Sequence, residues 1–126
     1  MKALLEAHLL MPKPLIIGAS SYLGAYYHHF FLKQSGVPLI ATTKNRTTPF
    51  HLDLSSPHIA HLPITDESYA IIIAAVTDLA YVENHPKCTA QLNVENILTL
   101  AFQCTAKGIT PIVFSTGYVF NGESDV

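Results

Sequence analysis

The chain has 126 residues, a formal net charge of −2, 49% hydrophobic and 13% charged residues, and a mean hydropathy of +0.30. This length suits one domain, and the apolar composition excludes a disordered chain. The seven basic residues are scattered, and no apolar run approaches the roughly 20 residues of a membrane-spanning helix, so we expect neither a nucleic-acid nor a membrane partner. Such an apolar domain is typical of a sheet buried on both faces, or of a surface that a partner covers.

The N-terminal residues and the two cysteines indicate the compartment in which the protein is expected. Residues 1–13 predict a short helical extension and residues 14–126 the domain itself. Polar residues interrupt the apolar part of the extension and no cleavage site follows, so it does not resemble a signal peptide. We expect Cys88 and Cys104 to lie too far apart to form a disulfide. A reduced, cytoplasmic setting is therefore expected.

Short apolar runs alternate with stretches of helical periodicity along the chain. The expected elements are strands at 14–17, 37–41, 50–54, 70–75 and 109–114, helices at 21–34 and 86–107, a short helix or ordered loop at 77–83, and a turn or short helix at 55–61. This alternation predicts an α/β fold with a Rossmann-like, doubly wound parallel sheet of about five strands in the order 3-2-1-4-5. The ligand crevice of such a sheet lies at the carboxyl ends of the strands, next to the first strand.

In the first long helix, the periodicity predicts that Leu23, Tyr26, Tyr27, Phe30 and Phe31 face the sheet. The apolar positions of the second long helix include Ala90, Val94, Ile97, Leu98, Ala101 and Phe102.

A turn of small residues follows the first strand and leads into the first helix. It runs from Gly18 to Gly24 and has Ser21 where the usual dinucleotide fingerprint would place a middle glycine. The first N–H groups of a helix have no internal partners and carry a partial positive charge, so a phosphate can bind there if the side chains are small. The same glycines also occur in ordinary strand-to-helix turns, so this turn alone leaves both interpretations open.

Other polar and small residues stand where the remaining strands end, and a parallel sheet brings these ends together. After the second strand come Thr42, Thr43, Lys44 and Arg46, with no acidic residue among them. An acidic residue there would bind the ribose 2′-hydroxyl of NAD, whereas hydroxyl and cationic groups suit a 2′-phosphate. NADP is therefore favoured over NAD, although a plain solvated loop would show the same residues.

The ends of the third and fourth strands also have two interpretations each. Asp53 could accept a hydrogen bond from an adenine amino group, or it could cap the turn that contains Ser55 and Ser56. Ala74 and Ala75 are small enough to let a cofactor cross the strand end, and equally suit helix–sheet packing.

Seven histidines are present, including the adjacent pair His28 and His29 and the pair His58 and His61 three residues apart. A zinc site needs a further ligand and a closed geometry, and nothing in the spacing indicates either. We interpret them as surface or partly packed side chains, and expect no metal.

Several short motifs together resemble one family. They are Gly18-x-x-Ser21-x-x-Gly24, Leu52-Asp53-Leu54, Ala74-Ala75-Val76-Thr77, Glu83-x-x-Pro86, Asn93-Val94 and Ser115-Thr116-x-Tyr118-Val119-Phe120-x-Gly122. In this order they resemble the extended short-chain dehydrogenases/reductases, and within them the dTDP-4-dehydrorhamnose reductases and related nucleotide-sugar epimerases. The resemblance covers residues 14 to 122.

The resemblance implies a dinucleotide cofactor, a possible nucleotide-sugar substrate and roles for particular residues. Together, the strand ends and the resemblance give as candidate cofactor-binding residues Gly18, Ser20, Ser21, Tyr22, Leu23, Gly24, Thr42, Thr43, Lys44, Arg46, Asp53, Leu54, Ala74, Ala75, Val76 and Ser115. The family pattern assigns the pyrophosphate to the turn after the first strand and the adenine to Asp53. It also assigns the hydrogen bond to the substrate carbonyl to Thr116, the one implied catalytic residue.

The family also uses a Tyr-x-x-x-Lys pair, and none of the six tyrosines is followed four residues later by lysine. Transfer of hydride to a carbonyl needs a proton for the developing alkoxide, and the family pattern supplies it from that tyrosine. We therefore expect the chain to be the NAD(P)-binding part of a nucleotide-sugar reductase or epimerase, truncated before the substrate-binding part and inactive by itself.

Two alternatives remain. One is a non-catalytic nucleotide-binding or regulatory module of the same fold, and the other is an unrelated five-stranded α/β domain. In the first two interpretations the last strand would leave an apolar edge, so we expect self-association or a partner that covers it.

Overall fold

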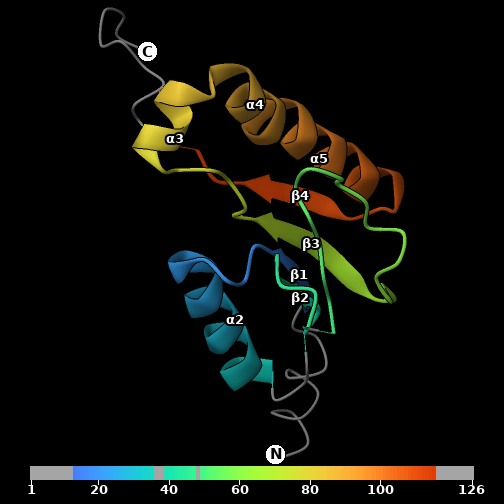
Figure 1. Ribbon diagram of the computed structural model, residues 1–126. Helices are drawn as coiled ribbons and strands as arrows, with labels where there is room; N and C mark the ends of the chain where they lie inside the picture. Colours follow the sequence, from blue (N-terminus) through green and yellow to red (C-terminus); the bar gives the residue numbers. More distant parts are fainter. Residues whose placement is uncertain (1–12, 36–38, 48, 116–126) are drawn as a thin grey trace, which may run out of the picture.

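The computed structural model describes residues 13–35, 39–47 and 49–115, which form two helical layers on opposite faces of one parallel sheet (Figure 1). The sheet has four strands in the order β2-β1-β3-β4. Its strands are β1 (Lys13–Ile17), β2 (Ala41–Thr42), β3 (Glu67–Ile72) and β4 (Thr110–Val113). The α/β fold with a parallel, Rossmann-like sheet is therefore confirmed.

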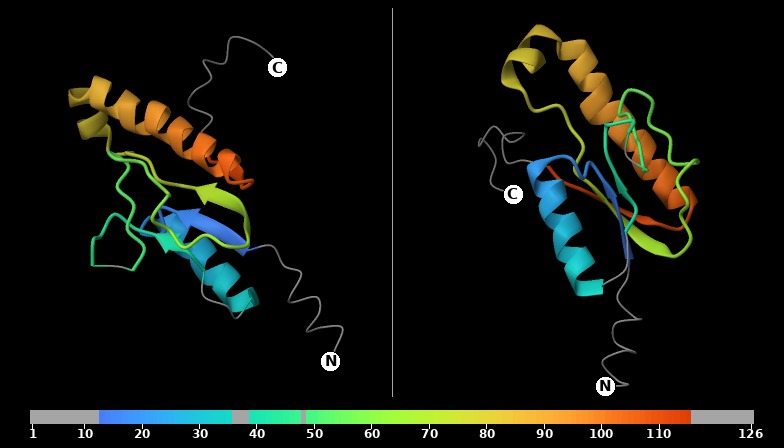
Figure 2. Two further views of the ribbon diagram at one scale, coloured as in Figure 1. Left: turned by 90° about the vertical axis from the view of Figure 1, so that its right-hand side faces the viewer. Right: turned by 60° about the horizontal axis from the view of Figure 1, so that its bottom comes forward.

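Helices cover both faces of the sheet (Figure 2). Helix α2 (Tyr22–Ser35) follows β1 on one face. On the other face lies a continuous helical run made of α4 (Pro86–Ala90), a π-helical turn η1 (Gln91–Glu95) and α5 (Asn96–Ala106), preceded by the short α3 (Leu79–Asn84). The sequence predicted this run as one helix at 86–107, and the π-helical turn within it was not predicted.

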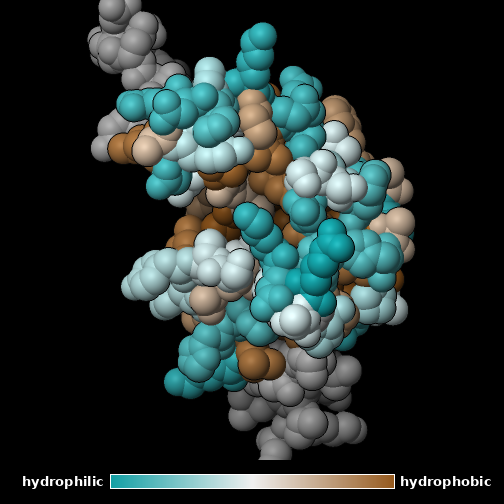
Figure 3. All heavy atoms as spheres, in the orientation of Figure 1, coloured by the Kyte–Doolittle hydropathy of each residue, from teal (hydrophilic) through white to brown (hydrophobic). Residues whose placement is uncertain are grey.

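The apolar strands account for this arrangement. Leu15, Ile16 and Ile17 are fully buried, as expected for a central strand covered on both faces. Alternate residues face opposite layers: Leu15 and Ile17 belong to the core under α5, and Ile16 belongs to the smaller core under α2. The band of hydrophobic residues between the long helix and the sheet is seen in Figure 3.

The predicted strand at 50–54 is wrong as a strand. Its backbone pairs with the end of β2 only through the isolated bridge Thr43↔His51, where Thr43 N donates to Phe50 O (3.0 Å) and Leu52 N donates to Thr43 O (2.9 Å). Strand β2 itself is two residues long, and Asp53 turns the chain away by accepting hydrogen bonds from Ser55 and Ser56. The segment thus lies beside β2, as the order 3-2-1-4-5 requires, without forming a ladder.

The apolar faces of the helices are wider than the buried ones. In α2, Tyr27 and Phe31 pack on the core, whereas Tyr26 and Phe30 are exposed. In the long helical run the buried positions are Thr89, Asn96, Ile97, Leu100 and Cys104, whereas Val94, Leu98 and Phe102 are exposed. Neighbouring residues on a helix differ by about 100° in direction, so one of two adjacent apolar residues often lies at the edge of the buried face or outside it.

Other elements begin or end a few residues away from their predicted boundaries. Strand β3 begins and ends three residues earlier than predicted, which leaves residues 73–76 as a loop at its carboxyl end. The predicted second strand at 37–41 falls partly outside the described residues. The predicted extension at 1–13 also lies outside them, except for Lys13, which begins β1. Cys88 and Cys104 are both free, as expected.

Candidate functional site

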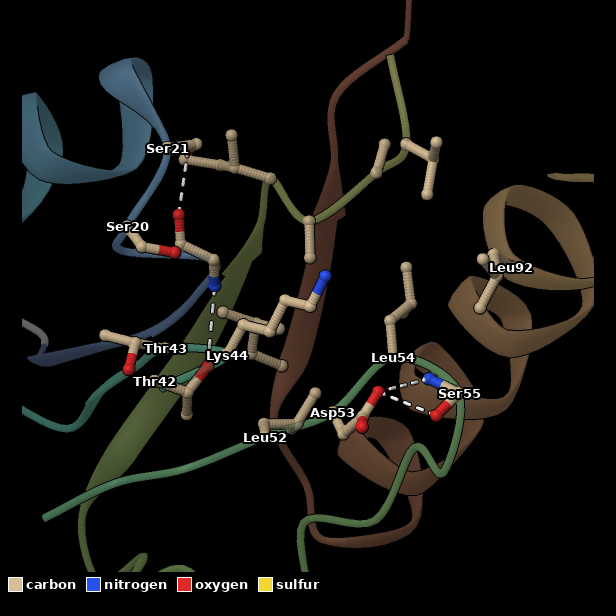
Figure 4. A pocket seen from close by; sticks show the side chains of 16 residues that line it. Ser20, Ser21, Thr42, Thr43, Lys44, Leu52, Asp53, Leu54, Ser55 and Leu92 are labelled. Atoms are coloured by element: carbon tan, nitrogen blue, oxygen red, sulfur yellow. Dashed lines mark hydrogen bonds between the residues drawn. The ribbon is translucent and has the colours of Figure 1, made fainter. Parts of the chain in front are cut away.

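A cavity of about 470 Å³ lies at the carboxyl ends of β1, β2 and β3, between the start of α2 and the long helix (Figure 4). It is lined by Ile17, Gly18, Ser20, Ser21, Thr42, Thr43, Lys44, Leu52, Asp53, Leu54, Ser55, Ile73, Ala74, Ala75, Val76 and Leu92. Its volume is within the usual range for sites that bind small molecules and cofactors.

The turn from Gly18 to Gly24 forms one wall and leaves no room for side chains at either glycine. Gly18 has φ of +97°, and a Cβ there would lie 2.8 Å from the amide nitrogen of Ala74. A Cβ at Gly24 would overlap the carbonyl oxygen of Gly18 and lie 2.8 Å from Ser21 Oγ. The two glycines therefore let α2 start directly against β1 and the end of β3.

Ser21 is the N-cap of α2. Its Oγ donates to Gly18 O (2.8 Å) and accepts from Gly24 N (3.0 Å), which satisfies the amide of the third helical residue. The amides of the first two helical residues, Tyr22 and Leu23, are among the donors that a helix leaves without internal partners. The hydroxyl proton of Ser21 is thus used within the turn, while the helix start keeps the donors and the dipole that attract an anion.

The turn is tied to β2 by Thr42, which is buried. Gly18 N donates to Thr42 Oγ1 (3.4 Å) and Ala19 N donates to Thr42 O (2.8 Å). Beyond it Lys44 is exposed, and its side chain extends over the cavity in Figure 4. Thr42, at the end of β2, therefore holds the glycine turn in place, and Lys44 offers its charge to the cavity.

Asp53 has one of the two roles that the sequence left open, that of capping a turn. Its Oδ1 accepts from Ser55 N (2.9 Å) and from Ser55 Oγ (2.7 Å), so it caps the following turn. These hydrogen bonds, helped by the positive charges of His51 and Lys44, lower the pKa of Asp53 below its ordinary value. Asp53 also lines the cavity, so it is an ionised acceptor at the cavity wall.

Two asparagines of the long helix hold the opposite wall, and sequence reasoning did not assign them this role. Asn93 accepts from Val76 N (2.8 Å) and donates to Val76 O (2.8 Å), which fixes the loop after β3. Asn96, which is buried, donates to Leu54 O (2.7 Å) from 42 residues away. Asn93 lies in the π-helical turn, where an extra residue shifts the side-chain phase of the helix.

Most of the residues predicted to bind the cofactor come together at this cavity. Tyr22, Leu23 and Gly24 belong to the helix start behind it, and the Tyr22 side chain is almost fully exposed. Arg46 lies at a neighbouring cavity, Ser115 is exposed outside both cavities, and Thr116 lies outside the described residues. The lining residues that sequence reasoning missed are Ile17, Leu52, Ser55, Ile73 and Leu92. All but Leu92 adjoin a predicted site residue, so proximity along the chain was an available signal.

Within the described part of the chain, no group of three or more histidine, cysteine or acidic side chains could hold a metal ion. No helix in the same residues is both long enough and apolar enough to cross a membrane.

Comparison with known proteins gives the family. No curated protein matches the chain. Residues 13–126 match the family model described as the RmlD substrate binding domain, which covers the whole of the cavity and the sheet. The chain therefore belongs to the RmlD substrate binding domain family, and so to the dTDP-4-dehydrorhamnose reductase-like proteins among the nucleotide-sugar reductases and epimerases.

Proposed function

We propose that this chain is the NAD(P)-binding part of an oxidoreductase that acts on a nucleotide sugar. The observation that carries the proposal is the cavity itself, which joins the glycine turn, the end of β2, Asp53 and the loop after β3 in one hollow. Ligands of doubly wound sheets bind at this edge, and the family is typically NAD(P)-dependent.

The residues at the cavity suit the parts of a dinucleotide. The amides at the start of α2, with Gly18 beside them, would receive the pyrophosphate, because the helix dipole favours negative charge there. Asp53 would accept from the adenine amino group through the carboxylate oxygen that Ser55 does not occupy, and Leu54 would contact the base. The loop at Ala74 offers small side chains to the other half of the cofactor, which supplies the hydride when bound.

The charges around the end of β2 favour NADP over NAD. Lys44 extends over the cavity, Arg46 is close by in the sequence, and both are exposed. The nearest carboxylate at the cavity, Asp53, already accepts two hydrogen bonds from Ser55. A 2′-phosphate would therefore meet cations instead of the acid that selects NAD.

We propose further that residues 1–126 bind cofactor without turning over. No tyrosine in this sequence is followed four residues later by lysine, so the family's proton donor and the lysine that lowers its pKa are absent. Thr116 would hydrogen-bond a substrate carbonyl, but a threonine hydroxyl does not replace an acidic tyrosine.

A non-catalytic module of the same fold is the second candidate, and the exposed apolar surface is where it would bind a partner. Ile112 and Val113 on the edge strand β4, and Phe114 directly after it, are each more than two-fifths exposed. An apolar edge strand of this kind pairs readily with another chain, so self-association or a covering partner is expected. Sedimentation velocity between micromolar and millimolar chain concentration tests this, because a chain that stays monomeric throughout contradicts self-association.

Titration of NADPH and NADH into the chain, followed by cofactor fluorescence, tests the proposed function. We expect NADPH to bind in the micromolar range and at least about tenfold more tightly than NADH. Gly24→Val should remove binding, and Gly108→Ala is the matched control, since nothing lies within 4 Å of a Cβ there. If neither cofactor binds, the proposed cofactor site is contradicted and the non-catalytic interaction module remains.

A further inference from the structure

The face of the sheet that carries α2 is only half covered. A helix is about 10 Å wide and neighbouring strands lie about 4.8 Å apart, so one helix covers roughly two strands. Among the described residues α2 is the one helix on this face, and it packs on the core around β1 (Figure 2). The four-stranded sheet therefore leaves room for a second helix over β3 and β4.

Strand β4 presents apolar side chains to this uncovered half. Ile112 pairs in register with Ile71 of β3, and Ile71 pairs with Ile16, which belongs to the core under α2. Because paired residues of parallel strands point to the same side of the sheet, Ile112 faces the layer of α2. Ile112 is 44% exposed, and so is Phe114 two residues further on.

Aromatic rings of α2 continue this surface. The ring centroid of Tyr27 lies 5.7 Å from that of Phe114, and the centroid of Phe31 lies 6.3 Å from that of Tyr69 on β3. Beside these two rings of α2 lie two exposed ones, Tyr26 at 6.0 Å from Tyr27 and Phe30 at 5.3 Å from Phe31. The flank of α2 and the side of β4 thus form one contiguous aromatic surface.

We call the exposed part of this surface the open face, and it consists of Tyr26, Phe30, Ile112 and Phe114. None of these side chains is charged, and three of the four are aromatic. Interfaces are enriched in such residues at their centre and depleted in charge, so the open face has the character of a contact surface.

Residues 1–12, which lie outside the described residues, have the composition of a segment that could cover such a face. Apart from Lys2, Glu6 and His8 they are leucine, methionine, alanine and proline. They also precede the match to the family model, which begins at residue 13, so the family's own fold does not account for them.

At helical spacing the polar and apolar residues of this segment separate. Lys2 and Glu6 share one side of a helix, and Leu4 and Ala7 lie on the opposite side. The residue before a proline avoids helical backbone, so the helix would end just before Pro12. An isolated helix of this length is marginal in water, and it needs a surface on which to pack.

The start of β1 brings this segment to the open face. Strand β1 begins at Lys13. Pro14 pairs in register with Tyr69, and Tyr69 with Thr110, so the amino ends of β1, β3 and β4 are level. A helix of about nine residues is roughly 13 Å long, which is about the rise of an extended chain from Thr110 to Phe114. The segment therefore has the length to run back along β4.

We propose that residues 1–12 fold back as a short helix on the open face, with Ala7 against Ile112 and Glu6 toward solvent. The helix runs antiparallel to β1 and lies beside α2, as elements that follow one another in the chain usually do. It gives this face of the sheet its second helix, and it leaves the backbone edge of β4 open to a partner.

Crosslinking in the full chain tests the position of the segment. In a Cys88→Ser background, which removes the exposed cysteine, Ala7→Cys is combined with Ile112→Cys and treated with a short bismaleimide. We expect peptide mass spectrometry to find a crosslink within one chain in most molecules. The matched control combines Glu6→Cys with Ile112→Cys and should crosslink at least about fivefold less, because residue 6 lies on the outer side of the helix.

Each other outcome of the crosslinking overturns the inference. Equal crosslinking from positions 6 and 7 would show a segment that only collides with the open face. Crosslinks that join two chains would show that a second copy covers it. Absence of any crosslink to Ile112 would place the segment elsewhere.

A second test uses the native cysteines and leaves the described residues unchanged. Ala7→Glu puts a charge on the inward side of the helix, and Lys2→Glu puts the same residue on the outer side. We expect the fluorescence of bound anilinonaphthalene sulfonate to rise at least about threefold in Ala7→Glu and to stay nearly constant in Lys2→Glu, because only the first uncovers the open face. An equal signal in the two variants contradicts the docked helix.

NADPH titration separates this inference from the proposed function. No residue of the open face lines the main cavity, so Ala7→Glu should bind NADPH within about twofold of the unchanged chain. A chain that crosslinks as expected and does not bind NADPH contradicts the proposed function alone. A chain that binds NADPH and does not crosslink contradicts the docked helix alone.

Discussion

The two walls of the main cavity are built in different ways. On the α2 side, the hydroxyl of Ser21 joins Gly18 and Gly24 within a seven-residue segment, and Gly18 also contacts Thr42 and Ala74. On the α5 side, Asn93 and Asn96 reach loops that are 17 and 42 residues away. The cap of the first wall needs only the local turn, whereas the hydrogen bonds of the second wall exist only when the long helix has docked on the sheet.

The largest expected effect comes from Gly24→Ala in the local wall. The added Cβ would overlap the Gly18 carbonyl oxygen, which is backbone and cannot move without displacing β1. We expect the free energy of unfolding to fall by about 3 kcal/mol, with loss of cofactor binding, as measured by urea denaturation and fluorescence titration.

The control for Gly24→Ala is Gly108→Ala. It has open space around the Cβ but a φ of +75°, so only the backbone strain of about 1 kcal/mol should appear. Equal losses in the two variants would contradict the steric explanation.

The next largest effect on stability is expected in the wall on the α5 side. Asn96→Ala removes the donor to Leu54 O from a buried site, and we expect a loss of about 2 kcal/mol in the free energy of unfolding. Asn93→Ala releases both backbone groups of Val76 and should weaken NADPH binding more than it lowers stability. Thr99→Ala is the control, because its hydroxyl bonds only Glu95 O of the same helical run. A control that costs as much as Asn96→Ala would remove the distinction between the walls.

A smaller effect is expected at the cap of α2. Ser21→Ala removes the hydroxyl that accepts from Gly24 N, at a cost of about 1 kcal/mol in thermal or urea unfolding. Ser21→Asp keeps an acceptor at the N-cap, so it should recover most of the stability. It should also weaken NADPH binding, since it puts a negative charge at the helix start. Equal NADPH affinity in the two variants would place the pyrophosphate elsewhere.

The smallest effect concerns the pH dependence that Asp53 gives to the stability of the cavity wall. The hydrogen bonds from Ser55 lower the folded-state pKa of Asp53, so its stabilising contribution is complete above the ordinary value of 3.8 and is lost as the pH falls through the lowered pKa. Asp53→Asn should therefore make stability less dependent on pH below about 4, and Ser55→Ala should raise the pKa of Asp53. Both are measured by urea unfolding and by carboxyl NMR titration. An unchanged acid profile in Asp53→Asn would contradict this assignment.

The features that could be predicted from the sequence are mostly those that depend on local contacts, as in the wall on the α2 side. The glycine turn, its position after a buried strand and the polar residues at the ends of β2 and β3 were predicted, because each depends on a few consecutive residues. The bridge at Thr43 and His51 was not predicted, since the alternation at 50–54 is the same for a strand and for a segment that pairs once. The exposed positions of Tyr26 and Phe30 were also missed, because two adjacent apolar residues do not reveal which one faces the core.

The apolar strands β1, β3 and β4, their parallel order and the turn from Gly18 to Gly24 could be predicted, since they follow from side-chain patterning and from the absence of a Cβ. The side-chain amides of the long helix that hold the cavity could be identified only from the fold. Asn93, Asn96 and Gln103 act through a single helix face on loops that lie at least 17 residues away along the chain. No local pattern encodes such contacts, because they depend on the docking angle and phase of the helix on the sheet.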